Sequence, residues 1–312
     1  MNVSICILSF NSENTILETL QSIKDQTYPL KKIEIVLSDD CSEDNSLEVI
    51  TKWKKEHINC FKNIVINRNS INLGISGNFN KSMELTSSDW IKSIGADDLL
   101  LPNCIKDNVT FVEDNSSSKI IFSKMVHFDN TNMQLKVTPD QHQRSFFNLS
   151  AEKQFNYLSF SSFNIAPTAF FLKDFILNEL GGFNSEYNLI EDLPMWANIT
   201  KKGVKLNFYN IETVKYRITD SISNPKETFL NINFHKQLNK VYEKEFIPHL
   251  KSSRKFILLM NIFADFLIIN IINFFGNKNN RFIRGLYRTL LFFKPLHLAF
   301  KLKRFYLRFF NL

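Results

Sequence analysis

Two adjacent carboxylates, Asp97 and Asp98, follow an apolar run at residues 90–94 after Gly95 and Ala96. A run of this kind is typical of a buried strand. Adjacent acids repel each other, so a fold that places them at the end of a strand usually supplies a cation there. Two explanations need no ligand: the pair lies in a solvated turn, or it caps a helix that begins near Asn103. The preceding part of the chain decides between these alternatives.

Predicted strands and helices alternate through the first hundred residues. Short apolar runs predict strands at residues 3–9, 33–38, 64–66 and 90–94. Apolar side chains at helical spacing predict three helices between them: one over residues 13–25, one carrying Leu47, Ile50 and Trp53, and one that follows a loop at 72–78 and carries Phe79, Met83 and Leu85. The alternation predicts an α/β fold with a mostly parallel sheet and helices on both faces.

Polar residues gather where the predicted strands end. Asn11, the pair Asp39-Asp40, Gly74 and the pair Asp97-Asp98 all fall at carboxyl ends of strands or in the loops that follow them. In sheets of this type ligands bind at that edge. The coincidence favours a ligand site over a solvated turn.

Another acidic pair, Glu191-Asp192, opens a predicted helix that has Pro194 in its first turn. The run Leu180-Gly181-Gly182-Phe183 precedes it and predicts a turn that requires glycine. Around these motifs we expect a helix at 103–115, strands at 120–122, 204–209 and 213–216, and a loop at 217–223. Residues 127–155 are polar and show no clear pattern.

Composition indicates a folded protein in a reducing compartment. The 312 residues are 44% hydrophobic and 22% charged, which suffices for a sizeable core. The four cysteines, Cys6, Cys41, Cys60 and Cys104, show neither zinc-site nor disulfide-scaffold spacing. The N-terminus lacks the basic region and cleavage site of a signal peptide. We therefore expect the protein in the cytoplasm.

The last 62 residues differ in charge from the rest of the chain. Residues 251–312 contain twelve Lys or Arg and a single acid, Asp265, so they carry +11 while the other 250 residues carry −4. A helix is expected at 229–246. The apolar segment 256–275 is long enough to cross a bilayer, but Asn261 and Asp265 share one helical face, which favours an interfacial or packing helix. Residues 281–310 mix cations with aromatic residues, as in an amphipathic helix on an anionic membrane.

The motifs, taken in order, resemble those of family 2 glycosyltransferases of the bacterial surface-polysaccharide type, which have the GT-A fold. The matching motifs are Leu8-Ser9-Phe10-Asn11, Asp39-Asp40-Cys41-Ser42-Glu43-Asp44, Asn72-Leu73-Gly74, Asp97-Asp98, Gly181-Gly182-Phe183, Glu191-Asp192 and Tyr216-Arg217. The resemblance covers about residues 1–223, which we expect to form the transferase domain. Residues 224–312 lie outside it and are expected to form a helical, membrane-associating extension.

The resemblance implies a role for each motif. Ser9, Asn11 and Gly74 would belong to the nucleotide-sugar pocket, with Asp40 accepting the uracil imide N–H. Asp97 would contact the ribose and Asp98 would bind the divalent metal. Asp192 would be the general base with Glu191 beside it. Gly182, Phe183 and Arg217 are candidate contacts of the acceptor or the diphosphate.

The activity implied is an inverting, metal-dependent transfer of a hexosyl or N-acetylhexosaminyl group. Mn²⁺ or Mg²⁺ would be the cofactor and a UDP-sugar the donor. The basic C-terminal segment favours a lipid-linked or growing surface glycan as acceptor, at the inner face of the cell membrane. A glycosidase is disfavoured because it needs one protonated acid, and Asp98 beside a cation would stay ionised.

Two departures from the family pattern and several alternatives stay open. Cys41 stands where glycine is usual. No histidine follows Tyr216-Arg217, so the third metal ligand stays open, with Arg217 or Asp220 as the residues that would compensate for the histidine. Without a ligand, Asp40 would be a helix cap, Asp192 a helix-dipole partner and Trp196 a core residue. Other functions are an inactive GT-A scaffold, a nucleotidyltransferase, whose glycine-rich loop is missing, or a nucleic-acid-binding protein, which no motif supports.

Overall fold

The computed structural model describes residues 1–161, 164–218 and 228–298. The chain divides into two compact units, each described here by itself. Unit 1 comprises Met1–Phe155 and Phe163–Thr219, and unit 2 comprises Asn156–Ser162 and Asp220–Leu312. The main division falls a few residues before the domain boundary expected between 223 and 224.

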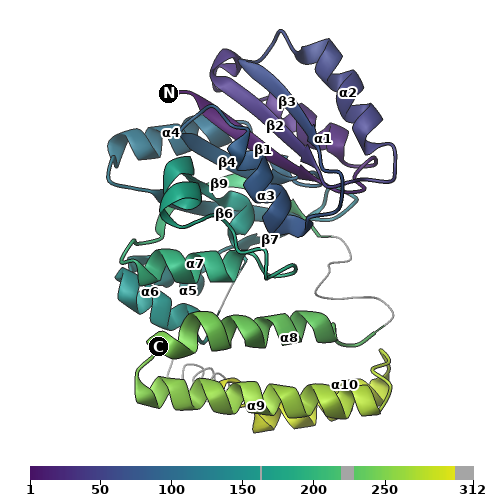
Figure 1. Cartoon of the computed structure of the whole chain (residues 1–312), viewed down its shortest axis with the longest axis vertical. Coiled ribbons are helices and arrows are strands. Elements are labelled where there is room, and N and C mark those ends of the chain that lie inside the picture. The colour runs from purple at the N-terminus through teal and green to yellow at the C-terminus, as the bar shows by residue number, and fades with distance from the viewer. Residues whose placement is uncertain (162–163, 219–227, 299–312) are drawn as a thin grey trace. The chain divides into compact units, whose positions relative to one another are not determined.

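Unit 1 is built on a mixed sheet (Figure 1). The strands follow the order β3-β2-β1-β4-β8-β6-β9-β5, with β7 paired to β6. Their bounds are β1 Val3–Ser9, β2 Ile33–Asp39, β3 Asn63–Arg68, β4 Trp90–Gly95, β5 Leu99–Leu100, β6 Ile120–Phe128, β7 Gln134–Thr138, β8 Phe170–Leu172 and β9 Asn207–Arg217. The four strands predicted in the first hundred residues are thereby confirmed.

The predicted parallel arrangement holds for the first half of the sheet. β1 lies between β2 and β4 and runs parallel to both, with Ser9 opposite Asp39 and Leu8 opposite Gly95. The carboxyl ends of these three strands therefore meet at one edge. Beyond β4 the sheet is mixed, because β8 enters from the opposite end and pairs antiparallel with β4 and β6, while β6 and β9 run parallel.

Helices cover both faces of this sheet. They are α1 Ile16–Lys24, α2 Ser46–His57, α3 Gly74–Glu84, α4 Cys104–Asp114, α5 Gln141–Arg144, α6 Ala151–Leu158 and α7 Asp192–Lys201. Alternate residues of β1 and β2 pack with buried side chains of α1, α2 and α4 in one core cluster. Cys6, on the other face of β1, is hydrogen-bonded by Ser82 of α3. Trp196 of α7 packs edge-on against Phe122, whose neighbour Ile121 belongs to the first cluster, so α7 covers the same face as α3.

Three local predictions need correction. The expected loop at 72–78 is shorter, because Gly74, with φ of +70°, turns the chain directly into α3. The two strands expected at 204–209 and 213–216 form the single strand β9, which stays paired to β6 through its polar middle. The unassigned segment 127–155 contains β7, α5 and α6. Its one strong sequence signal is the capping box of Asp140 and Gln143 at the start of α5.

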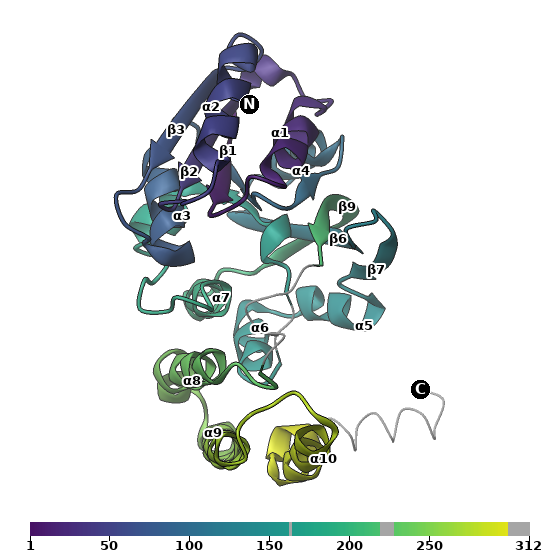
Figure 2. The same ribbon diagram turned by 90° about the vertical axis from the view of Figure 1, so that its right-hand side faces the viewer.

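In its described residues, unit 2 contains three helices of ten residues or more, which Figure 2 shows close to end on. They are α8 Ile232–Val241, α9 Ser252–Phe274 and α10 Arg281–Leu290, and a wider turn at Tyr242–Phe246 continues α8. Leu230, Ile268, Ile272 and Ile283 form their core. The predicted single helix over 281–310 is interrupted at Lys294, since Pro295 disfavours helical backbone in the residue before it. Residues 299–310 of that prediction lie outside the described part of the chain.

Candidate active site

The Asp97-Asp98 pair lies where β4 leaves the sheet edge. Asp98 is buried, with 3% of its surface exposed, so the pair is neither a solvated turn nor the cap of α4, whose N-cap is Asn103. Burial, and then the charge of Asp97, raise the pKa of Asp98 well above its usual value. Burial also raises the pKa of Asp97. A bound cation would stabilise the charged forms of two carboxylates buried side by side in this way.

The turn that carries this pair is held from two other elements. The backbone N–H of Arg217, at the end of β9, donates to Asp98 Oδ1 over 2.9 Å. The hydroxyl of Thr19, in α1, donates to the Asp98 carbonyl over 2.8 Å. A Cβ at Gly95 would lie 2.8 Å from Asp97 Oδ1, so a larger residue there would displace that carboxylate. The Asp98 carboxylate and the backbone of the turn are therefore held before any ligand binds.

Arg217 braces the same turn with its side chain. Its Nε donates to the Asp97 carbonyl over 2.9 Å, and its Nη2 lies 2.6 Å from Glu18 Oε2 on α1. The guanidinium also stacks over the ring of Phe128 at 4.6 Å. Arg217 was expected as a contact of the diphosphate or acceptor, but these bonds point to a positioning role. Glu18 carried no sequence signal, since it looks like any acid in the first turn of a helix.

Asp40 lies at the neighbouring strand end, beside Ser9. Its backbone N–H donates to the Ser9 carbonyl, and its Oδ1 accepts from Asn69 Nδ2 and from the N–H of Leu73. None of the hydrogen bonds formed by the described residues ends on Asp40 Oδ2, so that oxygen is available to a ligand donor. The helix-cap alternative for Asp40 is wrong, because the side chain that accepts from the N–H of Ser46 at the start of α2 is Asp44.

The loops around Asp40 adopt conformations that the sequence did not disclose. Asn11 has φ of +48° and Cys41 has φ of +64°, so the usual glycine at position 41 is replaced by a residue strained at positive φ. Asn11 Oδ1 accepts from the N–H of Glu43 over 3.0 Å, and this bond ties the loop after β1 to the loop after β2. Ser9 is buried and shares a hydrogen bond with Ser12.

The second acidic pair opens α7. Asp192 is the first residue of the helix and accepts from the N–H of Leu193 over 2.7 Å. Burial, and then the charge of Asp192, raise the pKa of Glu191 to about 7, and burial also raises the pKa of Asp192. At neutral pH this pair therefore exchanges a proton readily, as a general base must. The helix-dipole interpretation of Asp192 remains compatible with this position.

Tyr216 connects the two acidic pairs. Burial raises the pKa of its hydroxyl to about 12, and the charges of Asp98, Asp97 and Glu191 each add to the shift, against a hydrogen bond with Asn164 that lowers it. A charge shifts the pKa of another group only when the two lie a short distance apart, because the interaction weakens with separation. The carboxylates from the end of β4 and that of Glu191 therefore both lie near the Tyr216 side chain. The sequence identified Tyr216 only as a motif residue and gave no sign of Asn164.

The Gly181-Gly182-Phe183 turn anchors the loop that leads to this second pair. Gly182 has φ of +78°, and a Cβ there would lie 2.7 Å from Asn80 Oδ1. Asn80 bonds both the N–H and the carbonyl of Phe183, whose buried ring stacks on Phe79 at 4.5 Å. These contacts make the turn a docking element on α3, and they leave the expected acceptor contact of Gly182 and Phe183 without support. Trp196 is likewise buried in the core.

Lys92 lies buried beneath the site and was not singled out in the sequence. Its Nζ donates to the carbonyls of Pro167 and Ala169, over 2.5 and 3.3 Å. Burial lowers the pKa of this ammonium to about 8, while the charge of Asp98 opposes the shift. A lysine within an apolar strand run was the available signal.

The donor set fits a hard divalent cation. Asp98 and Asp97 offer carboxylate oxygens, which Mg²⁺ and Mn²⁺ prefer, and a diphosphate would supply further oxygens. Within residues 1–161, 164–218 and 228–298, no cluster of three or more His, Cys, Asp or Glu side chains is arranged to hold a metal. The position after Tyr216-Arg217, where a third ligand was sought, is Thr219 and Asp220, outside the described residues.

Comparisons with known proteins agree with this geometry. The glycosyl transferase family 2 model matches residues 4–181. A UDP-Glc:alpha-D-GlcNAc-diphosphoundecaprenol beta-1,3-glucosyltransferase, WfaP of Escherichia coli, is 29% identical over 219 residues, which are 69% of this chain and 77% of that protein. The abequosyltransferase RfbV of Salmonella typhimurium is 34% identical over 113 residues, or 36% of this chain and 33% of its own.

Solved structures share the fold. The crystal structure of S. aureus TarS 1-349 in complex with UDP-GlcNAc superposes with a TM-score of 0.63 at 18% identity, covering 93% of this chain and 80% of that one. A mannosyltransferase from Pyrobaculum calidifontis, in complex with GDP-Man and Mn²⁺, gives a TM-score of 0.58 at 14% identity, covering 93% and 74%. The fold is therefore GT-A. With a family model that spans more than half of its residues, this chain belongs to glycosyltransferase family 2.

Proposed function

We propose that the chain is an inverting, metal-dependent transferase that moves a hexosyl or N-acetylhexosaminyl group from a UDP-sugar to a lipid-linked or growing surface glycan at the inner face of the cell membrane. The observation that carries the proposal is that Asp97-Asp98 at the end of β4 and Glu191 at the start of α7 both lie near Tyr216. The first pair offers carboxylates to a cation, and burial and the charge of Asp192 raise the pKa of Glu191 to about 7.

The donor side is assigned to the sheet edge. Asp40 Oδ2 can accept the imide N–H of uracil, and Ser9 and Asn11 shape the floor on which the base rests. Gly74 contributes the start of α3 beside the donor. Asp98 would hold Mn²⁺ or Mg²⁺, with Asp97 turned to the ribose, and the metal would neutralise the departing diphosphate. The donor in the name of WfaP, UDP-Glc, and the ligand of the TarS complex, UDP-GlcNAc, support a UDP-sugar.

The acceptor side is assigned to the start of α7. Asp192 takes the proton of the acceptor hydroxyl while that oxygen bonds to C1 of the sugar and the bond from C1 to the diphosphate oxygen breaks. Attack opposite the leaving group inverts the configuration at C1, and no covalent intermediate is needed. The acceptor named for WfaP, a diphosphoundecaprenol, supports a lipid-linked glycan and hence a reaction at the membrane.

A donor screen tests this function. The purified full chain is mixed with Mn²⁺ and each of a panel of UDP-sugars, and thermal shift and release of UDP are recorded. We expect one UDP-sugar to raise the melting temperature in the presence of Mn²⁺ and to be hydrolysed slowly without an acceptor. If none binds and none is hydrolysed, the transferase assignment is replaced by the inactive scaffold.

A further inference from the structure

The helix α9 is closed on one face by its own unit. Asp265, near the middle of the helix, is 2% exposed and accepts from Lys294 Nζ over 2.6 Å. Asn239 Nδ2 of α8 donates to the same carboxylate over 3.2 Å, and His235 Nδ1 lies 3.4 Å from it. Partners from α8 and from the segment after α10 thus fix which side of α9 faces inward.

The opposite face of α9 is apolar and exposed. We call it the α9 stripe, formed by Phe256, Leu259, Phe263, Phe266, Leu267 and Phe274. At 100° per residue these side chains share an arc of about 100°. Phe256, Phe263 and Phe274 are 64%, 57% and 84% exposed. Between Phe256 and Phe274 the exposed Asn270 is the polar side chain within this arc, and the stripe is otherwise apolar. An exposed stripe of this composition marks a docking surface.

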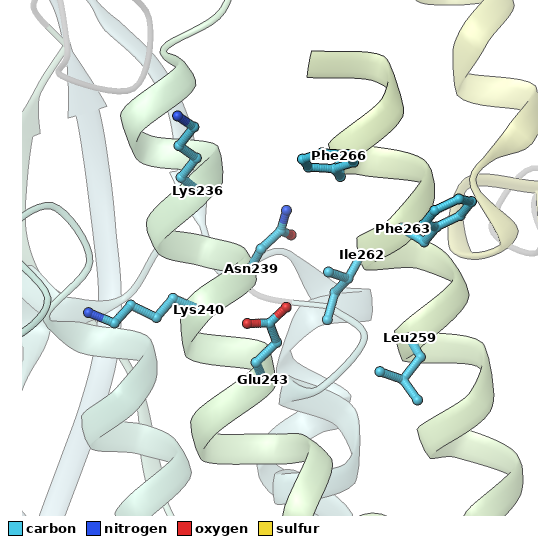
Figure 3. A pocket seen from close by; sticks show the side chains of 8 residues that line it. All are labelled: Lys236, Asn239, Lys240, Glu243, Leu259, Ile262, Phe263 and Phe266. Carbon is cyan, nitrogen blue, oxygen red and sulfur yellow. The ribbon is translucent and has the colours of Figure 1, made fainter. Parts of the chain in front are cut away.

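A groove of about 420 Å³ extends the α9 stripe toward α8 (Figure 3). Leu259, Phe263 and Phe266 line one side of it. On α8, Lys240 directs its ammonium group away from α9 and Lys236 extends along α8, while Asn239 and Glu243 stand between the helices (Figure 3). Lysines whose stems border an apolar wall and whose charges point outward are typical of the boundary between lipid and water.

Cations flank both ends of the α9 stripe. Lys251, Arg254 and Lys255 are exposed at the start of the helix, and Lys278 and Arg281 are exposed just beyond its end. The single acid of residues 251–298, Asp265, is neutralised inside the unit. The exposed charge of this region is therefore positive, which complements an anionic lipid surface.

We propose that α9 lies in the plane of an anionic phospholipid bilayer, with the α9 stripe inserted at the level of the headgroups and first methylenes. By length and composition α9 could cross a membrane. A span would, however, place the Asp265 network and its polar partners from α8 in the hydrocarbon, at a high cost. The docking face is thus α9, for which the sequence left an interfacial and a packing helix open beside the cationic segment 281–310. This inference rests on the membrane location in the proposed function and specifies how the chain reaches it.

Vesicle flotation with the full chain tests the docking face. The protein is floated with vesicles of phosphatidylcholine, with and without phosphatidylglycerol. The wild type should float strongly only with the anionic vesicles. The variant Phe256→Gln/Phe263→Gln/Phe274→Gln should lose about tenfold or more of its partitioning, because each Phe contributes apolar area buried in lipid. Phe263→Gln alone, which disturbs folding least, should lose about threefold.

Matched controls separate the alternatives. Met133→Gln/Leu135→Gln removes exposed apolar side chains of unit 1 and should leave partitioning unchanged. Light scattering should show the same oligomeric state for the wild type and the stripe variants. Unchanged flotation of the triple and single variants, or a stripe variant that changes only the oligomeric state, would assign the stripe to a second copy. Resistance of membrane-bound wild type to alkaline carbonate extraction would show a span. UDP-sugar binding in solution, measured on the same variants, reports on the proposed function independently.

Discussion

The two acidic pairs of unit 1 contain the same chemical groups in different surroundings. Asp97-Asp98 lies at the end of a central strand and is held by Arg217 from β9 and by Thr19 from α1. Glu191-Asp192 lies where a loop enters α7, and the bond described for Asp192 comes from the backbone of its own helix. The first pair is held by distant parts of the chain, and the second by its immediate neighbours.

This difference separates binding from proton transfer. A metal ligand must keep its geometry whether or not the metal is present, so bonds from several elements suit it. A general base must change its protonation state in each turnover, which a pKa near 7 allows. We therefore expect substitutions of the first pair to affect donor binding and turnover together, and substitutions of the second to affect turnover alone.

The largest effect is expected from Asp98→Asn. The amide keeps the shape of the side chain but removes the charge that would hold the cation. Turnover should fall by about a thousandfold or more, and Mn²⁺-dependent affinity for the UDP-sugar should fall with it. Steady-state kinetics and calorimetric titration of the donor measure the two effects. A fully active Asp98→Asn enzyme would refute the metal role.

Asp192→Asn should reduce turnover by a similar factor, about a hundred- to ten-thousandfold, through loss of the base. The donor affinity should stay within about twofold of the wild type, because no donor contact is removed. The same titration and kinetics apply. If donor affinity collapsed here as well, the division of labour between the two pairs would be wrong.

The pH dependence sharpens the contrast. Burial and the charge of Asp192 raise the pKa of Glu191 to about 7, so the pair holds a proton below that pH. Turnover should rise about tenfold per pH unit up to neutrality and then level off. In Glu191→Gln the neighbouring charge is gone, so the pKa of Asp192 should fall and the profile should shift toward acid. An unchanged profile would contradict coupling between the two acids.

Stability should follow pH in the opposite direction. A raised carboxyl pKa means that the folded state binds more protons than the unfolded chain between about pH 4.5 and 7, so stability falls across that window. Allowing for partial solvent exposure, the loss should be about 1–2 kcal/mol, and Glu191→Gln should remove much of it. Urea denaturation of the wild type and of Glu191→Gln at pH 5 and pH 8 measures the change in stability of each.

The acids at the strand ends could be predicted from the sequence, whereas the residues that hold them in place could not. Apolar runs and acids at their ends located Asp40 and Asp98, because a buried parallel strand leaves a strong local pattern. Arg217 and Glu18 are 199 residues apart, and their contact depends on the packing of β9 beside α1. A single sequence carries no periodic signal for such a pair. The same holds for Asn80, which fixes the turn of Gly182 from a different helix.

In unit 2 the sequence likewise predicted the helices but not the side chains that pair between them. Composition correctly indicated helices and the shared inner face of Asn261 and Asp265, both of which are buried. It did not show that Lys294 would form an ion pair with Asp265, because Lys294 lies beyond the helix break that follows α10. A cation counted as part of the basic surface is therefore a structural partner. The pattern of residue types predicts which face of α9 is buried, whereas the partners of Asp265 depend on how the helices pack.

The smallest effect is expected from the brace of the first pair. Glu18→Gln weakens the ion pair with Arg217, whose side chain is 5% exposed while that of Glu18 is 51% exposed, so stability should change by only about 1 kcal/mol or less. If the brace positions Asp97-Asp98, the KM for the donor in Mn²⁺ should rise about three- to tenfold while kcat stays nearly constant. Binding of UDP without metal should not change. Glu84→Gln breaks the exposed pair with Lys81 and is the matched control. Equal effects in the two variants would reduce Arg217 to an ordinary stabilising residue. If only the metal-dependent step is affected, Glu18 of α1 belongs to the residues that position the Asp97-Asp98 carboxylates.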